Sequence, residues 1–372
     1  MFSAMQAYKY KIRTSKHITQ IFERTLGVCC DLYNAGLQHR RDAYRVAGEC
    51  VSYAEQCREL TDVREVDTDV AAVYSQVGQD ALRRLNKAFL AFFRRAKSGE
   101  TPGYPRFRSK SRYDSFTYPQ QGFSLKGDKL TLAKIGSCRL RLSRPVAGTI
   151  KTCTIKREAD GWYVIFAVEE NSCRYIPKTG KSVGVDVGIE SFATLSTGAK
   201  IENPKYLRQA ERRLKTAGRC VSRKKLRGGN RRKASKLLAK QHLKVKRQRH
   251  DFFHKRSLDL LREFDGFAFE SLNIAGMVKN HHLAKSIADA AWNTFLNIHT
   301  AKAENAGRVV GLVLAAFTSQ DCSRCGNRVR KSLAVREHRC IQCGLVLHRD
   351  HNAAINIRGR ADLLVIAEPS AR

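Results

Sequence analysis

The chain lacks any hydrophobic run long enough to cross a membrane. Its longest apolar stretch, VVGLVLAAF at 309–317, is about half of a membrane span. The opening residues, MFSAMQAYKYKIR, do not contain the apolar region of a signal peptide. We therefore expect a cytoplasmic protein with neither a signal peptide nor a transmembrane segment.

Acidic residues are scarce. The 372 residues include 34 Asp and Glu against 69 Lys and Arg, a formal net charge of +35. Such an excess repels itself in a compact state unless a polyanion neutralises it, which favours nucleic acid as the partner. A basic surface kept for solubility, or one that meets an acidic membrane leaflet, is the alternative. With 42% apolar residues, the chain is expected to form two or three globular units.

A disulfide framework is also missing. Eight of the twelve cysteines follow no pairing pattern, which is typical of a reducing compartment, and we interpret them as small buried or inert thiols. They are Cys29, Cys30, Cys50, Cys57, Cys138, Cys153, Cys173 and Cys220.

The other four cysteines have the spacing of a structural zinc site. They form the pattern Cys322-x2-Cys325-x14-Cys340-x2-Cys343, two thiolates on each of two tight turns. A glycine follows the second cysteine of each pair, where such a turn needs a residue that tolerates positive φ. With four cysteine ligands the zinc has no open position for catalysis. The alternative, four reduced cysteines without metal, would leave the loop between them without an adequate core.

Most of the first hundred residues are predicted to be helical. From about residue 15 to 97 the pattern favours helix, most clearly from Thr68 to Lys97, where one apolar stripe predicts a core face beside a basic face. Glycines and prolines in KSGETPGYPRF end this region. The stripe consists of Val70, Val73, Tyr74, Val77, Ala81, Leu82, Leu85, Phe89, Phe92 and Phe93.

The period changes to two between residues 115 and 170. This indicates a small antiparallel sheet or barrel, with hairpins at Gly127-Asp128 and Asp160-Gly161. One face of this sheet is predicted to be basic. It would suit a nucleic-acid backbone, but an ordinary solvent-exposed face explains the pattern equally well.

A strongly basic helical hairpin is predicted between residues 205 and 262. These 58 residues hold 22 Lys and Arg against three acids, so they carry +19 of the net charge. We expect the helices to follow phosphates; a low-complexity basic tail is the alternative. The candidate nucleic-acid contacts are Arg223, Lys224, Lys225, Arg227, Arg231, Arg232, Lys233, Lys244, Lys246, Arg247 and Arg249.

Three acids stand at the ends of predicted elements of an α/β unit. Asp186 lies in the first of two strands predicted within 182–198, which a turn at Gly188 separates, Glu270 follows the strand FAF, and Asp350 opens the helix DHNAAINI. An Asp before a helix is often an N-cap, which is the alternative for Asp350. If the three converge, they offer the oxygen ligands that Mg²⁺ prefers. Two such ions would activate a water for attack on a phosphodiester and stabilise the leaving oxygen.

Four motifs together resemble one family. GVDVGIESFATLS, FESLNIAGM, TSQDCSRCG with CIQCG, and RDHNAAINI occur in the order and spacing of TnpB, the transposon-associated RNA-guided nucleases related to type V CRISPR effectors. The segment GETPGYPRFRSKSRYDSFTYPQ also resembles the one that joins that family's helical region to its β-barrel. The similarity covers residues 68 to 358.

The resemblance implies a multidomain α/β and α+β architecture. It comprises an RNase H-like (RuvC) nuclease domain with an inserted zinc ribbon, a small antiparallel wedge β-barrel and a helical recognition lobe. The implied boundaries are 1–14 for the first barrel strand, 15–105 for the helical lobe, 106–178 for the barrel, 179–318 for the nuclease domain with the hairpin 205–262, 319–347 for the zinc ribbon, 348–360 for the last RuvC segment and 361–372 for a tail.

The resemblance also implies the activity. The catalytic set falls on Asp186, Glu270 and Asp350, which would bind two Mg²⁺, with Mn²⁺ as a substitute, beside one structural zinc. A guide RNA from the transposon end and a double- and single-stranded DNA target are the implied partners, in a prokaryotic cytoplasm at the nucleoid. The family commonly has an acid at the position of His348, whereas Asp350 keeps its spacing to Asn352. A guided repressor that does not cut, or a transposase of RNase H fold, is the alternative.

Overall fold

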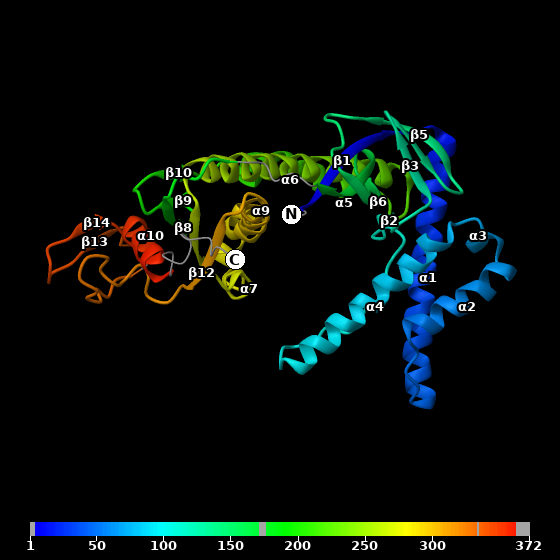
Figure 1. Cartoon of the computed structure of the whole chain (residues 1–372), viewed down its shortest axis with the longest axis horizontal. Helices are drawn as coiled ribbons and strands as arrows, with labels where there is room; N and C mark the ends of the chain where they lie inside the picture. The colour runs from blue at the N-terminus through cyan, green and yellow to red at the C-terminus, as the bar shows by residue number, and fades with distance from the viewer. Residues whose placement is uncertain (1–3, 171–175, 333–334, 362–372) are drawn as a thin grey trace. The chain divides into compact units, whose positions relative to one another are not determined.

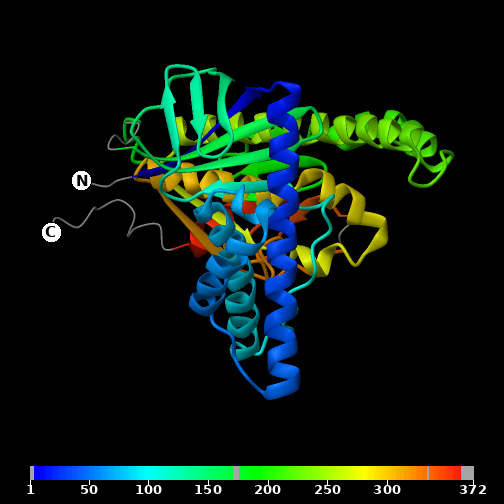
Figure 2. The same cartoon turned by 90° about the vertical axis from the view of Figure 1, so that its right-hand side faces the viewer.

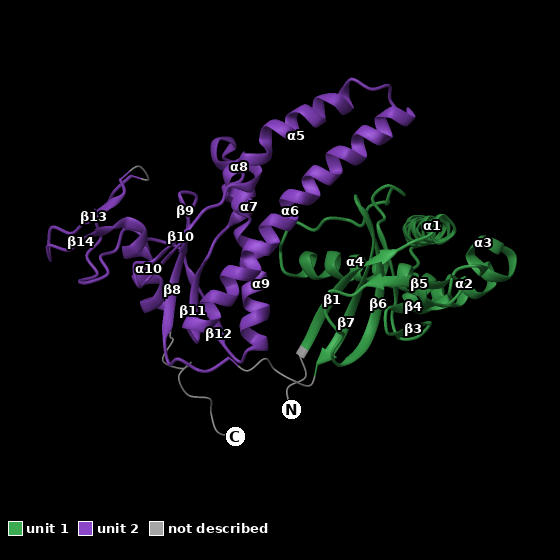
Figure 3. Cartoon of the chain, turned by 90° about the horizontal axis from the view of Figure 1, so that it is seen from above, with its two compact units in different colours: residues 1–172 green, residues 173–372 purple. Residues whose placement is uncertain are grey.

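The computed structural model describes residues 4–170, 176–332 and 335–361. The chain divides into two compact units, residues 1–172 and 173–372 (Figure 3). The predicted tail lies outside the described residues apart from residue 361, and so does Cys173. No helix within the described ranges is both long enough and apolar enough to span a membrane.

The first unit is built on a seven-stranded sheet whose paired strands are all antiparallel (Figure 1). The strand order β2-β6-β7-β1-β5-β4-β3 leaves β2 and β3 at the edges, and it places the first strand of the chain at the centre. The predicted hairpin at Gly127-Asp128 is confirmed, because Lys126 pairs with Lys129 across those two residues. The strands are β1 (Ala4–Arg13), β2 (Ser115–Tyr118), β3 (Phe123–Lys126), β4 (Lys129–Leu132), β5 (Gly136–Arg141), β6 (Thr149–Glu158) and β7 (Gly161–Glu170).

Four helices accompany this sheet: α1 (Lys16–Ala47), α2 (Tyr53–Val66), α3 (Thr68–Ala71) and α4 (Ser75–Lys97). The helix α1 runs as one straight rod (Figure 2), and its apolar face joins the same core as the sheet. The predicted continuous helix from Thr68 is interrupted between α3 and α4. The guanidinium of Arg64 donates to the carbonyls of Val70, Ala71 and Val73, so a side chain from α2 satisfies the groups that the break leaves free.

The second unit contains a five-stranded mixed sheet of order β10-β9-β8-β11-β12. The first three strands of this order are antiparallel, whereas β8, β11 and β12 are parallel. The strands are β8 (Ser182–Val187), β9 (Ser191–Leu195), β10 (Lys200–Glu202), β11 (Gly266–Ser271) and β12 (Val309–Leu314), with the hairpin strands β13 (Glu337–Arg339) and β14 (Val346–His348) apart from them.

Helices lie between the parallel strands along the chain. Parallel strands need such crossover connections, and the predicted order of strand, helix and strand supplies them. The predicted basic hairpin is present as α5 and α6, which project from the rest of this unit (Figure 3). The helix predicted for 285–307 is broken at Ala291, which has φ of 50°. The helices are α5 (Tyr206–Ser222), α6 (Gly229–Glu263), α7 (Ile274–Met277), α8 (His281–Ala290), α9 (Trp292–Asn305) and α10 (Arg349–Arg360).

One glycine sets how closely α10 approaches the sheet. A Cβ on Gly184 of β8 would lie 2.1 Å from the carbonyl oxygen of Ala354 and 2.6 Å from the nitrogen of Arg358. Only glycine permits this contact, since both opposing atoms belong to the helix backbone. The contact places the start of α10 beside the carboxyl end of β8.

The unpaired cysteines are less uniformly buried than predicted. Cys29, Cys30, Cys138 and Cys153 lie in the core, but Cys50 and Cys220 are exposed. The prediction that no disulfide framework exists holds for the described cysteines, all of which are free thiols.

A buried histidine makes the stability of the second unit depend on pH. His299 packs among Phe267, Phe269 and Phe295, its Nδ1 lies 3.1 Å from the hydroxyl of Ser257, and burial lowers its pKa to about 4. Between that value and the ordinary 6.5, the unfolded chain binds a proton that the folded chain does not. The free energy of unfolding should therefore fall by about 3 kcal/mol as the pH drops from 6.5 to 4.

Urea unfolding followed by the fluorescence of Trp292, which begins α9, would measure this loss. The variant His299→Gln keeps a polar group for Ser257 but does not titrate, so its free energy of unfolding should change less across this range. The exposed His282→Gln is the control and should retain the full slope. An unchanged slope in His299→Gln would assign the pH dependence to another group.

Candidate functional site

Asp186 and Glu270 lie side by side at the carboxyl ends of two neighbouring strands of the second sheet. The parallel strands β8 and β11 are in register up to the pair Val185 and Phe269, so the next residue of each strand is the acid. Equivalent positions on neighbouring parallel strands are about 4.8 Å apart and point to the same face. The predicted pairing of these two acids therefore follows from the strand register.

Asp350 reaches the same end of these strands from the first turn of α10. Burial raises the pKa of Asp186 well above its ordinary value, and the negative charges of Glu270 and Asp350 raise it further. Burial also raises the pKa of Glu270. A bound cation would relieve the repulsion at Asp186, and carboxylate oxygens suit a hard cation such as Mg²⁺. Among the described residues, the oxygens of the three acids do not form a cluster as tight as that of the four cysteines.

The alternative role of Asp350 as a helix N-cap is wrong. The cap is His348, whose Nδ1 accepts a hydrogen bond from the backbone N–H of Asp350 at 3.3 Å. Because the imidazole supplies the acceptor that the first turn needs, the carboxylate of Asp350 is not used for capping. His348 thus occupies the position of the family's usual acid and performs a capping function there.

Glu270 is oriented by Thr318, a buried residue of the segment between β12 and the cysteines. The hydroxyl of Thr318 donates to Oε1 of Glu270, and this hydrogen bond lowers the carboxyl pKa against the effect of burial. The backbone carbonyl of Thr318 accepts from Nδ2 of Asn356 at 2.8 Å. Glu270 is therefore connected to α10, the helix that carries Asp350.

The four predicted cysteines form one cluster. Their sulfur atoms all lie within 4.8 Å of one another, with Cys322 and Cys343 3.6 Å apart, so the cluster could hold a metal ion. Backbone N–H groups, first that of Cys343, lower the pKa of Cys340 to about 6, whereas burial and the neighbouring thiols raise the pKa of Cys325 and of Cys343. Cys340 is therefore the thiol most ready to become the thiolate that a metal needs. Sulfur ligands in this number suit zinc.

The two glycines behave as the spacing predicts. Gly326 and Gly344 have φ of 75° and 71°, and their N–H groups donate to the carbonyls of Cys322 and Cys340, both at 2.9 Å. Each pair of cysteines is therefore held on a tight turn before any metal binds.

A buried asparagine joins this cluster to α10. The side chain of Asn352 accepts from the backbone N–H of Ser323 at 2.9 Å and donates to the carbonyl of Asp321 at 2.8 Å. Asn356 also donates to Asp321, at 2.7 Å. Thr318, Asn352 and Asn356 hold this region together through hydrogen bonds, and none of these roles was predicted from the sequence. The one available signal was the pair of asparagines four residues apart, which places both on one face of the helix.

Most of the predicted nucleic-acid contacts are exposed on the basic hairpin, whereas Arg231 and Arg249 are partly buried and bonded within the protein. Arg231 donates to the carbonyls of Val221 and Lys224, and Arg249 is paired with Asp289 at 2.8 Å. The exposed ones are Arg223, Lys224, Lys225, Arg227, Arg232, Lys233, Lys244, Lys246 and Arg247.

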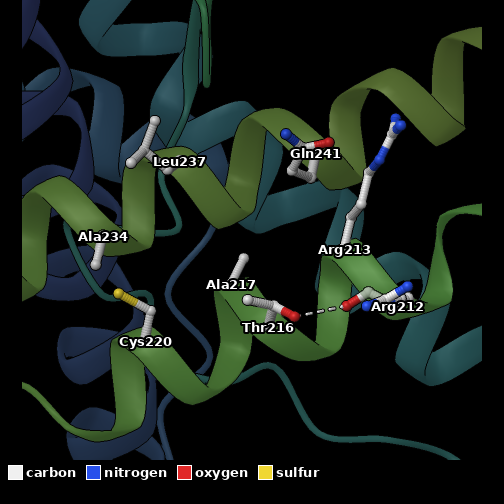
Figure 4. Close-up of a pocket in the computed structure, with 8 residues that line it drawn as sticks. All are labelled: Arg212, Arg213, Thr216, Ala217, Cys220, Ala234, Leu237 and Gln241. Atoms are coloured by element: carbon white, nitrogen blue, oxygen red, sulfur yellow. Dashed lines mark hydrogen bonds between the residues drawn. The ribbon is translucent and has the colours of Figure 1, made fainter.

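A groove of about 620 Å³ runs between α5 and α6 (Figure 4). Its lining is largely apolar, with the guanidinium groups of two arginines at one end. The groove is distinct from the three acids, since none of them lines it. The lining residues are Arg212, Arg213, Thr216, Ala217, Cys220, Ala234, Leu237 and Gln241.

Comparisons with known proteins agree with these features. A protein of Streptomyces pristinaespiralis named "Putative RNA-guided DNA endonuclease" is 36% identical over 96% of this chain and 89% of its own length. The chain belongs to the TnpB family. InsQ of Escherichia coli, with the same description, is 26% identical over 95% of the chain and 91% of its own length. A mimivirus "TnpB-like protein" is 25% identical over 59% of the chain.

Family models match three parts of this TnpB-family chain. A model described as "Probable transposase" matches residues 165–281, and one described as "Cas12f1-like, TNB domain" matches residues 292–357. A "Helix-turn-helix domain" model matches residues 1–49, where the structure has one strand followed by one continuous helix, α1. The described part of that segment therefore contains a single helix, whereas a helix-turn-helix motif has two.

The fold is similar to that of Cas12f1. A Cas12f1 chain solved by cryo-electron microscopy with sgRNA and target DNA superposes with a TM-score of 0.59 over 96% of this chain and 84% of that chain, at 14% identity. The two proteins therefore share a Cas12f-like fold of mixed helices and sheets.

Proposed function

We propose that this protein is an RNA-guided, Mg²⁺-dependent DNA endonuclease encoded by a transposon, and that it cuts DNA beside a short motif that the protein reads. The observation that carries this proposal is the meeting of Asp186, Glu270 and Asp350 at the carboxyl ends of β8 and β11. These acids are up to 164 positions apart in the sequence, and the charges of Glu270 and Asp350 both raise the pKa of buried Asp186, an arrangement that a bound cation would stabilise.

The topology of the second unit supports an RuvC-like assignment. In chain order, the antiparallel strands β8, β9 and β10 are followed by β11 and β12, which run parallel to β8. Asp186 stands near the end of β8 and Glu270 near the end of β11. This arrangement agrees with an RNase H-like domain. We assign residues 179–318 and 348–360 to this domain and 319–347 to a zinc ribbon. In the first unit, we assign the sheet to a wedge barrel and α1 to α4 to a recognition lobe.

The chemistry would be phosphodiester hydrolysis. Two Mg²⁺ held by the three carboxylates would activate a water and stabilise the leaving oxygen. The chain's own residues keep this site in order. Thr318 fixes the rotamer of Glu270, His348 caps the helix that presents Asp350, and Gly184 lets that helix approach β8.

The names of the relatives support a guide RNA and a DNA target as partners. Pairing by the guide would read the sequence, while the protein would bind the duplex through its backbone and shape. The exposed cations of the α5–α6 hairpin are suited to phosphates.

The test is plasmid cleavage by the purified ribonucleoprotein. RNA that co-purifies with the protein should be sequenced, and its variable end should be reprogrammed to match a plasmid flanked by a randomised motif. Cleavage that requires Mg²⁺, follows the new guide and stops with EDTA is the expected result. Guided binding without cleavage would instead indicate a repressor, and strand transfer without RNA would indicate a transposase.

Thr318 provides a sharper test of the acid site. Thr318→Val keeps the shape of the side chain but removes the hydroxyl that holds Glu270, so divalent-metal affinity should fall about tenfold. Binding of Mn²⁺ to nucleic-acid-free protein, followed by electron paramagnetic resonance, measures this directly. Thr318→Ser keeps the hydroxyl and should remain close to the parent. Equal affinities in all three proteins would mean that Thr318 does not position Glu270.

A further inference from the structure

The apolar stripe of α4 extends beyond the core that it was predicted to face. Val77, Ala81, Leu82 and Leu85 are buried as expected. In the last turns of the helix, however, Leu90 is 61% exposed and Phe93 is 53% exposed. The stripe therefore continues onto the surface, where large apolar side chains indicate a binding site when they cluster.

Aromatic rings cluster at this end of the helix. Phe93 packs on Phe92 with ring centres 5.2 Å apart, and Tyr104, from the segment after α4, packs edge-on against Phe92 at 5.5 Å. Phe89 lies beneath, stacked on Phe93 at 6.3 Å. We call Phe92, Phe93 and Tyr104 the aromatic patch. Tyr104 is 45% exposed, so two of the three residues are about half exposed to solvent.

The surroundings of the aromatic patch are strongly basic. Residues 87–112 contain eight Lys and Arg and a single acid, Glu100. Glu100 lies 4.0 Å from Arg95, whereas neither Arg94 nor Lys97 has an ion pair among the described residues. Solvent-exposed aromatic rings next to cations that lack an ion pair favour a partner that is both planar and anionic.

We propose that the aromatic patch binds unpaired bases of a single-stranded nucleic acid, and that Arg94 and Lys97 contact its phosphates. Every base has a ring face, and aromatic side chains next to cations are the usual means of holding unpaired bases. A second copy of the chain fits poorly, because a two-fold contact through this surface would bring the like charges together. The proposal rests on the proposed function and deepens it by assigning a nucleic-acid site to residues of the first unit, whereas the three carboxylates belong to the second unit.

The test uses the full-length protein freed of nucleic acid and a short single-stranded RNA or DNA that carries one 2-aminopurine. The fluorescence of this base falls when it stacks on a ring. We expect quenching with the parent protein, and we expect Phe93→Leu to lose the quenching and to bind about tenfold more weakly. The slope of log Kd against log salt should be unchanged in Phe93→Leu but smaller in Arg94→Gln, because only the second substitution removes a charge.

Leu90→Ala is the matched control. Leu90 is as exposed as Phe93 and lies on the same helix but has no ring, so base stacking does not need it, whereas a protein interface would. Tyr104→Leu tests the patch from a different segment of the chain. Since the altered side chains of Phe93 and Leu90 are exposed, thermal unfolding should match that of the parent.

Three outcomes would overturn the proposal. They are normal quenching in both Phe93→Leu and Tyr104→Leu, an equal loss in Leu90→Ala, and a dimer in sedimentation that Phe93→Leu dissociates. None of these measurements depends on cleavage. A protein that binds unpaired bases at the aromatic patch but never cuts DNA would refute the nuclease and leave this inference standing.

Discussion

Asp186→Asn is expected to abolish DNA cleavage while leaving nucleic-acid binding intact. The substitution keeps the shape of the side chain but removes the carboxylate on which the charges of Glu270 and Asp350 act. Losing about 4 kcal/mol of metal-dependent stabilisation of the transition state corresponds to roughly a thousandfold fall in rate. Single-turnover cleavage of a guided plasmid measures the rate, and a gel-shift titration measures the binding.

The same substitution should not destabilise the metal-free protein. Because the pKa of Asp186 is raised, its charge is unfavourable in the folded state, and an amide removes that cost. Thermal unfolding of Asp186→Asn should therefore occur at the same or a higher temperature. The exposed Asp62→Asn is the control and should cleave as the parent does. Cleavage at the parental rate by Asp186→Asn would refute the assignment of the three acids.

Cys322→Ser is expected to release the zinc and, with it, the alignment of Asp350. Cys322 is buried, and the backbone N–H of the next residue, Ser323, is held by Asn352 on α10. Structural zinc in small domains contributes on the order of 10 kcal/mol to folding, so the loss of one thiolate should disorder the segment around the cysteines. Cleavage should then fall sharply although all three acids remain.

Metal analysis of the purified protein gives the zinc content, expected to be one per chain in the parent and well below one in Cys322→Ser. Hydrogen exchange should increase in both the cysteine cluster and the first turn of α10. Cys50→Ser, an exposed thiol far along the chain, is the control. If the variant lost zinc but retained full cleavage, the zinc cluster would be independent of the carboxylates.

The features best predicted from the sequence were those that depend on residues close together in the chain. The cysteine spacing, the glycines after each pair and the hairpin at Gly127-Asp128 depend on local backbone geometry, and the structure agrees with them. The strands around Asp186 and Glu270 were recognisable because apolar runs ended at an acid. The roles of these two acids and of Asp350 stay predictions.

Other features could not be predicted because they depend on partners distant in the sequence. The break between α3 and α4 is satisfied by Arg64 from another helix. The capping role of His348 was hidden because a local rule favoured Asp350. The exposure of Phe93 could not be predicted either. Periodicity shows which face of a helix is apolar, but it does not show how far along the helix that face is packed against the core.

The sequence by itself determined the composition of the sites: four thiols at metal spacing, three acids at element ends, and a large positive charge concentrated in one hairpin. These follow from residue type and from the fixed rise of strands and helices. Only the tertiary structure decided how the sites are joined. The register of β8 with β11 pairs two of the acids, while the space left by Gly184 and the hydrogen bonds of Asn352 connect both this sheet and the cysteine cluster to the helix that carries the third acid. Close packing fixes such distances, whereas sequence separation does not.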